Sequence, residues 1–390
     1  MNVTKDIKYI GVDDPTLTLF EGQYHLPAGM CYNSYVIEDD DIAVFDTSDV
    51  RTLAPWEEKL KAALGDRKPT YLIIQHMEPD HSAGIKRMLD LYPEVKIVAS
   101  AKAVQMLPLY FEGVDLEGRT HVVKEGDTLC LGRHTLRFVN APMVHWPEVI
   151  MTYDETDKAL FSADGFGKFG VYDADRDDWA CEARRYYFNI CGKYGISVQQ
   201  VLKKAAKLDI QRILPLHGPI LEGEAMTTAV KLYDTWSKYD VETPGVLIAC
   251  ASIHGGTLCA AQYLQGQLEQ RGAGKVVLTD LTTDDQAEAI EDAFRMSHLV
   301  CCASSYDAGV FPPMHDFIYH LGIKGYQRRK VALVENGSWA PTAAKVMREM
   351  FAPMKNITLV EPSITIRGRM HEADKPAFEA LADTLAADFK

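Results

Sequence analysis

The first part of the chain consists of short apolar runs that stop abruptly at polar residues. The segment 32–49 has apolar runs on both sides of an acidic turn, which predicts a β-hairpin. Three later segments each end an apolar strand in histidine, aspartate, glycine or proline: 134–142, 159–167 and 211–219. Apolar spacing predicts helices over 54–64 and 198–207. We therefore expect a β-rich α/β domain with its polar groups gathered at strand ends.

A different pattern begins at Pro244, where apolar strands alternate strictly with helices. The expected strands are Val246–Cys250, Lys275–Leu281, Leu299–Ala303, Lys330–Val334 and Ile357–Val360. The expected helices include Leu258–Arg271, Asp284–Met296, Thr342–Phe351 and Asp374–Phe389. Five apolar strands joined by helices indicate a parallel sheet covered on both faces. The polar segment 232–245 closes with Pro-Gly and reads as a linker, so we predict one domain over 1–243 and a second over 244–390.

Composition narrows the class of protein. The net charge of -14 argues against nucleic-acid binding, which requires basic clusters. No apolar run approaches the length of a membrane span, and the N-terminus lacks the apolar core of a signal peptide. None of the 8 cysteines forms a Cys-x-x-Cys pair, which argues against a zinc ribbon or a rubredoxin-type iron site. Buried free thiols in a reducing compartment fit this pattern, so we expect a cytoplasmic protein with no membrane contact.

The densest polar segment, QHMEPDHSAGI, directly follows the apolar run 71–74. It carries His76, Glu78, Asp80 and His81, and later strand ends carry His145, Asp164 and His217. Strand ends on one edge of a sheet converge, and seven such groups are too many for one tetrahedral zinc. They suit two metals with one bridging carboxylate. A solvated turn is a reasonable alternative for any one of these residues, but a weak one for all seven together.

The order His-x-Glu-x-Asp-His, followed by His, Asp and His, resembles the metallo-β-lactamase-type domain. Hydrolases of that superfamily usually carry His-x-His-x-Asp-His, and the Glu78 variant is similar to the flavodiiron proteins, which reduce oxygen or nitric oxide. The resemblance implies an N-terminal αββα sandwich followed by a flavodoxin-like domain. It also implies an oxo- or hydroxo-bridged diiron centre. In it His76, Glu78 and His145 bind one iron, Asp80, His81 and His217 bind the other, and Asp164 bridges.

There is a physical reason, independent of the resemblance, for Glu78 in place of a histidine. A carboxylate is a harder, anionic ligand than a neutral imidazole, and it favours the more oxidised metal state. A centre that cycles between ferrous and ferric iron gains from such a ligand, whereas a zinc hydrolase has no need of it. Carboxylate-rich dizinc sites also exist, so this residue alone does not decide the metal.

In the second half, ligands of a parallel α/β sheet bind beyond the carboxyl ends of the strands. The loop after the first strand opens directly into a helix, where free N–H groups and the helix dipole favour an anion. It matches neither G-x-G-x-x-G nor a P-loop, and it resembles the flavodoxin phosphate loop with His254 and Gly256 as departures. We predict FMN, held by Ser252, His254, Gly255, Gly256, Thr257, Ser304, Ser305, Tyr306, Asp307, Gly309, Asn336, Gly337, Ser338 and Trp339. Each loop taken alone is equally a plain turn.

Two further residues lie where the resemblance places pocket groups. His25 and Tyr194 are predicted to donate protons or hydrogen bonds near the metals, with a surface histidine and a core tyrosine as the alternatives. The remaining histidines are expected to be structural or solvated, with His254 the possible phosphate contact: 121, 134, 254, 298, 315, 320 and 371.

The resemblance covers essentially the whole chain and implies the minimal two-domain class, with no fused rubredoxin or flavin-reductase module. It therefore implies a separate electron donor such as rubredoxin, and a head-to-tail homodimer that pairs into a tetramer in some members. The expected reaction is reduction of dioxygen to water. Nitric oxide reduction at the same site is the main alternative. A zinc-dependent hydrolase with a docking module, or an electron carrier or sensor with a vestigial metal site, is less favoured because of Glu78 and the full ligand set.

Overall fold

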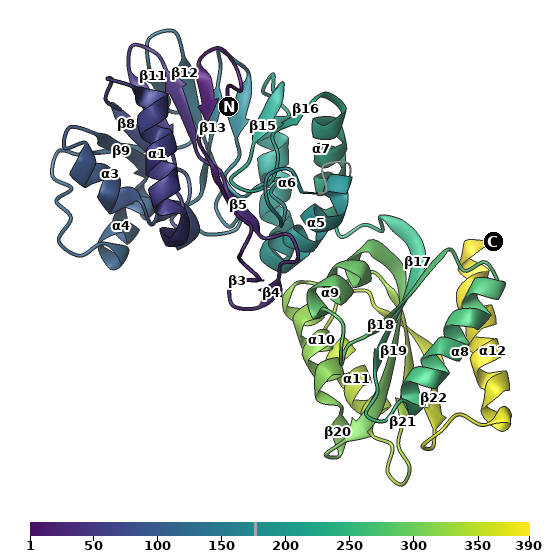
Figure 1. The fold of residues 1–390 in the computed structure, drawn as a ribbon. Helices are drawn as coiled ribbons and strands as arrows, with labels where there is room; N and C mark the ends of the chain where they lie inside the picture. The colour runs from purple at the N-terminus through teal and green to yellow at the C-terminus, as the bar shows by residue number, and fades with distance from the viewer. Residues whose placement is uncertain (175–177) are drawn as a thin grey trace. The chain divides into compact units, whose positions relative to one another are not determined.

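The computed structural model describes residues 1–174 and 178–390, which divide into two compact units, Met1–Asp234 and Thr235–Lys390. Each unit is an α/β structure with its own sheet or sheets (Figure 1). Among the described helices, none combines the length and the apolar character needed to cross a lipid bilayer.

The first unit contains two six-stranded sheets. The first sheet has the order β1 (Ile7–Tyr9), β6 (Tyr35–Glu38), β7 (Ile42–Phe45), β8 (Tyr71–Ile74), β9 (Lys96–Ser100) and β10 (Thr120–Val123). The second has the order β11 (Thr128–Cys130), β12 (Thr135–Asn140), β13 (Ile150–Asp154), β14 (Ala159–Phe161), β15 (Arg212–Leu214) and β16 (Leu221–Glu222). The predicted hairpin at 32–49 is confirmed, because β6 and β7 pair antiparallel.

Side chains alternate between the two faces along each strand, so one set packs between the two sheets, which form a sandwich. Tyr35 and Phe45 face the second sheet, and Phe45 stacks on Phe161 with ring centroids 3.9 Å apart. Val36 and Val44 face the opposite way, into a core shared with the helices on the outer face of the first sheet. Those helices are α1 (Leu53–Leu64), α3 (Ile85–Leu91) and α4 (Ala101–Tyr110). The other helices of the unit are α2 (Pro79–Ser82), α5 (Trp179–Tyr186), α6 (Gly195–Ala205) and α7 (Gly223–Ser237), the last of which runs across the boundary of the two units.

Two short hairpin-like pairs complete the first unit. β2 (Val12–Asp14) pairs with β5 (Met30–Tyr32), and β3 (Leu19–Phe20) pairs with β4 (Tyr24–His25). The sequence pattern did not indicate these pairs, because two or three residues are too few to show an alternation.

The second unit has one sheet of five parallel strands in the order β18 (Lys275–Asp280), β17 (Thr243–Ala251), β19 (Met296–Tyr306), β21 (Lys330–Asn336) and β22 (Thr358–Ile366). This order, 2-1-3-4-5 in the sequence of strands, is the flavodoxin-like arrangement. Five helices flank the sheet, and the short β20 (Gly309–Val310) extends β19: α8 (Gly256–Gln270), α9 (Gln286–Arg295), α10 (Pro312–Ile323), α11 (Ala343–Phe351) and α12 (Lys375–Ala386). The αββα sandwich followed by a five-stranded parallel sheet agrees with the predicted fold class.

The boundary of the two units lies earlier than the predicted boundary at 243/244. The reason is the buried guanidinium of Arg329, which ties the segment 235–242 to the second unit. It donates hydrogen bonds to the carbonyl oxygens of Tyr239 (2.9 Å), Asp240 (3.2 Å) and Met296 (2.7 Å). The polar character of 232–245 suggested a linker, and the sequence offers no sign that a residue 90 positions away binds its backbone.

This arrangement predicts the effect of conservative changes at two adjacent arginines. Arg329→Lys leaves several buried carbonyl oxygens without donors, so it is expected to lower the free energy of unfolding by about 3 kcal/mol. Arg328→Lys is the matched control, because Arg328 is exposed and pairs with Asp240 at the surface. Its expected effect is below about 0.5 kcal/mol. Denaturant unfolding measures both, and equal effects would contradict the tethering role of Arg329.

Candidate metal centre

Polar side chains converge where several strands of the first unit end. His76 and Glu78 follow β8, and Asp80 and His81 lie on α2, which comes directly after them. The other three follow β12, β14 and β15: His145, Asp164 and His217. Because β7 and β8 run parallel, as do β14 and β15, their carboxyl ends bring polar loops to one region.

The first donor cluster consists of His76, Glu78, His145 and Asp164. The Nε2 atoms of His76 and His145 lie 3.2 and 3.0 Å from Glu78 Oε2. The same two nitrogens lie 3.4 and 3.1 Å from Asp164 Oδ2. Two imidazole nitrogens therefore point at two carboxylate oxygens, which is the donor set of a hard transition metal.

The second donor cluster consists of Asp80, His81 and His217. The Nε2 atoms of the two histidines are 3.0 Å apart, and Asp80 Oδ2 lies 3.2 Å from His81 and 3.3 Å from His217. Asp164 reaches this cluster with its other oxygen, Oδ1, which is 3.3 Å from His81 Nε2. Asp164 thus offers one oxygen to each cluster, as a bridging carboxylate would.

Several carboxylate oxygens in this region are buried and accept no hydrogen bond, although two of them lie 3.2 to 3.3 Å from the Nε2 atom of His81. Both side-chain oxygens of Asp80 and Oδ1 of Asp164 are in this state. An unpaired buried carboxylate oxygen is costly, and a bound cation removes that cost. The donor set, its convergence and these unpaired oxygens fit two metal ions.

The charges of the clusters shift their own protonation. Burial by itself lowers the pKa of the His81 imidazole, but Asp80 and Asp164 outweigh burial and raise it to about 10. Burial likewise opposes protonation of His145, yet Asp164 and Glu78 raise its pKa to about 9. In the absence of metal the imidazoles therefore hold protons that balance the carboxylates. Metal ligands must be deprotonated, so binding of metal releases these protons.

Groups outside the clusters orient the histidines. Glu148 is buried, and its Oε1 accepts hydrogen bonds from His76 Nδ1 (2.8 Å) and Met77 N (2.9 Å). His217 Nδ1 donates to the backbone oxygen of Cys31 at 2.7 Å. Each bond leaves the Nε2 atom of its histidine free to face the cluster, which is the usual arrangement around metal-bound histidines.

Asp46 holds the backbone that carries the first ligands. Its Oδ1 accepts from the N–H groups of Gln75 (2.9 Å) and His76 (3.2 Å). Burial raises its pKa to about 6, and its φ of 52° lies in the left-handed region. The sequence pattern did not identify Asp46, Glu148 or Cys31 as part of the site. An aspartate directly after strand β7 was a signal for the first, whereas a backbone oxygen such as that of Cys31 leaves none.

The two predicted pocket residues, His25 and Tyr194, are not members of the two donor clusters. His25 pairs with Leu19 across the β3–β4 hairpin, on the exposed side of the strands, while Phe20 and Tyr24 are buried. Tyr194 is half-buried in a short 3-10 turn, where Lys193 lies over its ring. Neither residue belongs to a donor cluster or lines the cavity bordered by Glu78 and Asp80. Tyr186 instead lies beside the second donor cluster, buried, with its ring centroid 5.6 Å from that of His217.

In the second unit, the loops at the carboxyl ends of the strands enclose a pocket of about 530 Å³. It is lined by the predicted residues Ser252, His254, Gly256, Thr257, Ser304, Ser305, Tyr306, Asp307, Asn336, Gly337, Ser338 and Trp339. Gly255 and Gly309 are not part of its lining: Gly255 adopts a φ of 81° at the start of α8, and Gly309 pairs with Tyr306 in β20. Gly368 also lines the pocket and was missed.

Local details of this pocket suit a phosphate and a flat ring. A Cβ on Gly256 would lie 2.3 Å from the Gly368 oxygen, so only glycine fits there. The Ser252 hydroxyl is buried without a partner beside the N-terminus of α8. The Trp339 indole is 90% exposed, which leaves its face available for stacking.

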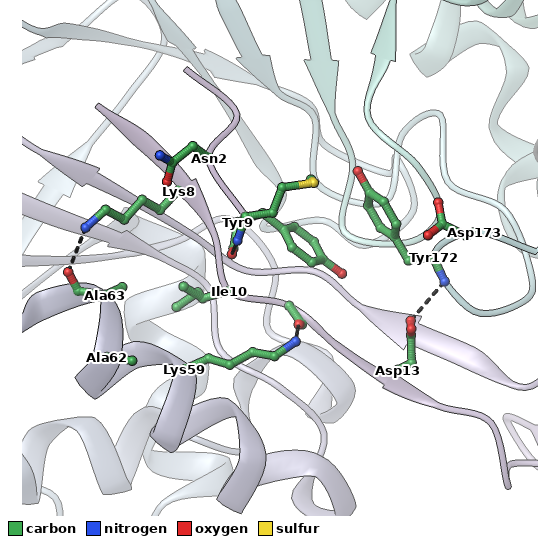
Figure 2. A pocket seen from close by; sticks show the side chains of 12 residues that line it. Asn2, Lys8, Tyr9, Ile10, Asp13, Lys59, Ala62, Ala63, Tyr172 and Asp173 are labelled. Carbon is green, nitrogen blue, oxygen red and sulfur yellow. Dashed lines mark hydrogen bonds between the residues drawn. The ribbon is translucent and has the colours of Figure 1, made fainter. Parts of the chain in front are cut away.

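Another pocket, of about 520 Å³, lies beside β1 and α1 of the first unit (Figure 2). Its lysines are already bound: Lys8 Nζ donates to the Ala63 oxygen and Lys59 Nζ to the Gly11 oxygen. Tyr9 Oη donates to Asn33. None of the residues of the two donor clusters lines it, so it is not the reaction site.

Comparison with known proteins agrees with this geometry. The family model described as "ODP family beta lactamase" matches residues 30–218. Nitric oxide reductase of Moorella thermoacetica is 25% identical over 379 residues, covering 94% of this chain and 92% of that protein. Diflavin flavoprotein A 1 of Synechocystis is 30% identical over 300 residues, covering 74% of this chain and 51% of that protein. The chain thus spans about half the length of the diflavin flavoproteins that it matches.

The fold is also found in a solved structure. Rubredoxin oxygen:oxidoreductase of Desulfovibrio gigas superposes with a TM-score of 0.93 at 22% identity, covering 100% of this chain and 98% of that one. The two units and the double donor set define a redox protein that joins a metallo-β-lactamase-like domain to a flavodoxin-like domain. The chain is homologous to flavodiiron proteins. Flavodiiron proteins are oxidoreductases that bind FMN and a non-haem diiron centre. The two donor clusters of the first unit fit such a metal centre.

The hydrogen bond from His76 to Glu148 predicts a selective effect on one metal. Glu148→Gln replaces an anionic acceptor by a weaker neutral one, so it is expected to reduce affinity at the first donor cluster by about 10- to 100-fold. Cobalt(II) titration of the metal-free protein, followed by visible absorption, should show one weakened step and one unchanged step. Glu155→Gln, which removes a surface ion pair with Arg137, is the control. Two unchanged steps would contradict the role of Glu148.

Proposed function

We propose that this protein reduces dioxygen to water, with four electrons and four protons for each dioxygen. The observation that carries the proposal is Glu78, whose carboxylate lies between the imidazoles of His76 and His145. An anionic oxygen ligand at this position stabilises the oxidised state of a metal that cycles during turnover. A hydrolytic zinc site gains nothing from such a ligand.

The proposed ligand assignment follows the two clusters. His76, Glu78 and His145 hold one iron, Asp80, His81 and His217 hold the other, and Asp164 bridges the two through its two oxygens. When bound, the diiron centre and FMN supply electron storage and a place for a small gas to bind.

The protein's own residues prepare that place. Glu148 and the Cys31 oxygen fix the tautomers of His76 and His217, so that each presents an unprotonated Nε2. Phe20 packs edge-on against His217 with ring centroids 5.8 Å apart, and Tyr186 covers the same imidazole. These rings keep bulk water from one side of the second donor cluster.

For the second unit we propose that the pocket formed by the three predicted loops holds FMN. The hydroxyls of Ser252 and Thr257 and the N-terminus of α8 suit the phosphate. The exposed Trp339 suits the flavin ring. A flavin held here would accept electrons from a small carrier such as rubredoxin and pass them on.

Nitric oxide reduction is the second candidate, in which two nitric oxide molecules, two electrons and two protons give nitrous oxide and water. The similarity to the Moorella thermoacetica nitric oxide reductase over nearly the full length of both chains supports it. We further propose that the protein is cytoplasmic and forms a head-to-tail homodimer or a tetramer, since the family resemblance implies these arrangements.

The direct test is turnover by the purified protein loaded with iron and FMN. With the same reduced donor, consumption of oxygen and of nitric oxide is measured separately. Faster oxygen consumption supports the main proposal, and faster nitric oxide consumption supports the second. A colourless zinc protein that hydrolyses esters or lactams would overturn both.

Substitution of the bridging carboxylate tests the ligand assignment. Asp164→Ala is expected to lower turnover by more than about 100-fold while FMN stays bound, because the two irons lose their shared ligand. Iron and flavin content are measured alongside turnover. Asp66→Asn, at an exposed position of the same unit, is the control. Normal turnover and normal iron content in Asp164→Ala would refute the bridging role.

A further inference from the structure

The β3–β4 hairpin forms one wall of a cavity that opens onto the metal centre. The cavity has a volume of about 360 Å³. Glu21 and Phe20 line it from the hairpin, and the predicted ligands Glu78 and Asp80 line it from the α2 region. Glu21 therefore lines the same cavity as one predicted ligand from each donor cluster.

The other charged groups that face this cavity are already engaged. Glu78 and Asp80 belong to the donor clusters. Arg51 Nε lies 3.1 Å from Asp49 Oδ1, and its Nη2 donates to Tyr32 Oη at 2.9 Å. Asp14 adds a further ion pair to Arg51 at 3.4 Å, from beside the cavity.

Glu21 differs from these groups. Among the described residues its hydrogen-bond partner is Gln23, at 3.4 Å, and its side chain is exposed to solvent. Of the titratable groups that line the cavity, Glu21 is thus the carboxylate that can exchange with water on one side and face the ligands on the other.

The backbone holds Glu21 in an unfavourable conformation. Gln23 N donates to the Phe20 oxygen at 3.0 Å, and Glu21 and Gly22 between them have φ values of 48° and 69°. This is a type I′ turn, whose first central position favours asparagine, aspartate or glycine. A glutamate in the left-handed region is unusual, and such strain is concentrated at functional sites.

The charges around Glu21 agree with a role in proton exchange. In the metal-free protein, desolvation and the negative charge of Glu78 raise the pKa of Glu21 to about 7, with a smaller rise from Asp80 and an opposing effect of His145. Glu21 gains a proton as the pH falls through about 7 and stays protonated at lower pH.

We propose that Glu21 is the residue that passes protons from solvent to the metal centre during gas reduction. This inference rests on the proposed function. Each dioxygen takes up four electrons from the flavin-linked donor and four protons from water, and leaves as two waters. For each proton, the O–H bond of the Glu21 carboxyl breaks toward the cavity. It then re-forms with a proton from bulk water, so Glu21 is unchanged over the cycle.

The hairpin places Glu21, and not the predicted His25, in this position. Leu19, which pairs with His25 across the hairpin, lines the cavity together with Phe20, Glu21 and Gly22, whereas His25 is not part of the lining. Glu21 lies at the tip of the hairpin, next to Phe20, whose ring contacts His217.

Kinetics of the iron- and FMN-loaded protein test the proposal first. Glu21→Gln keeps the size of the side chain and removes its proton, so turnover is expected to fall on the order of 100-fold above about pH 7. Glu21→His should restore part of it, because imidazole also exchanges protons near neutral pH. Glu112→Gln, at an exposed position of the same unit, is the control. Wild-type turnover, pH profile and solvent isotope effect in Glu21→Gln would overturn the proposal.

A second measurement does not depend on turnover. Infrared difference spectra of the metal-free protein, recorded from about pH 5 to about pH 8, report carboxyl groups that titrate in this range. The wild type and Glu112→Gln should show two protonated-carboxyl bands, one from Asp46 and one from Glu21, and the second should be missing from Glu21→Gln. Identical spectra in all three proteins would overturn the proposal. If the wild-type protein itself reduced neither gas, the proposed function would fail, and the infrared result would still report on Glu21.

Discussion

The first unit depends on the position of Asp164 between two groups of histidines. One of its oxygens faces His76 and His145, and the other faces His81. Such a carboxylate must be buried to reach both clusters, and burial makes its charge expensive unless positive charge surrounds it. Protons on the imidazoles meet this need in the metal-free protein, and metal ions meet it in the loaded one. The strand ends and loops around Asp164 are therefore arranged by one electrostatic requirement.

The supporting groups show how the fold meets that requirement. Glu148 lies three residues after His145, yet it orients His76. The Cys31 oxygen orients His217 from a strand 186 positions earlier in the chain. Asp46 binds the backbone of Gln75 and His76 from the end of the neighbouring strand. His76 and His217 are thus each held by a segment other than their own, which keeps their geometry rigid when charges change.

In the second unit, backbone atoms form much of the expected anion site. Its pocket uses a helix N-terminus and a glycine whose hydrogen leaves room for the Gly368 carbonyl. Anion binding by N–H groups needs few charged side chains, which agrees with a chain of net charge -14. The two units therefore hold their ligands by different means, charged side chains in one and backbone N–H groups in the other.

The sequence by itself determined the two halves, the parallel sheet and the seven polar residues that meet in the first unit. Apolar periodicity and ligand spacing are local properties of the sequence, so they can be recognised without knowledge of long-range contacts. The tertiary structure decided what depends on contacts between distant residues. Arg329 draws 235–242 into the second unit, and Cys31 and Glu148 orient the histidines. The β3–β4 hairpin places Glu21 rather than His25 in the lining of the cavity. A short hairpin has too few residues for its register to be read from its pattern, so only the folded chain could show which of its faces meets the site.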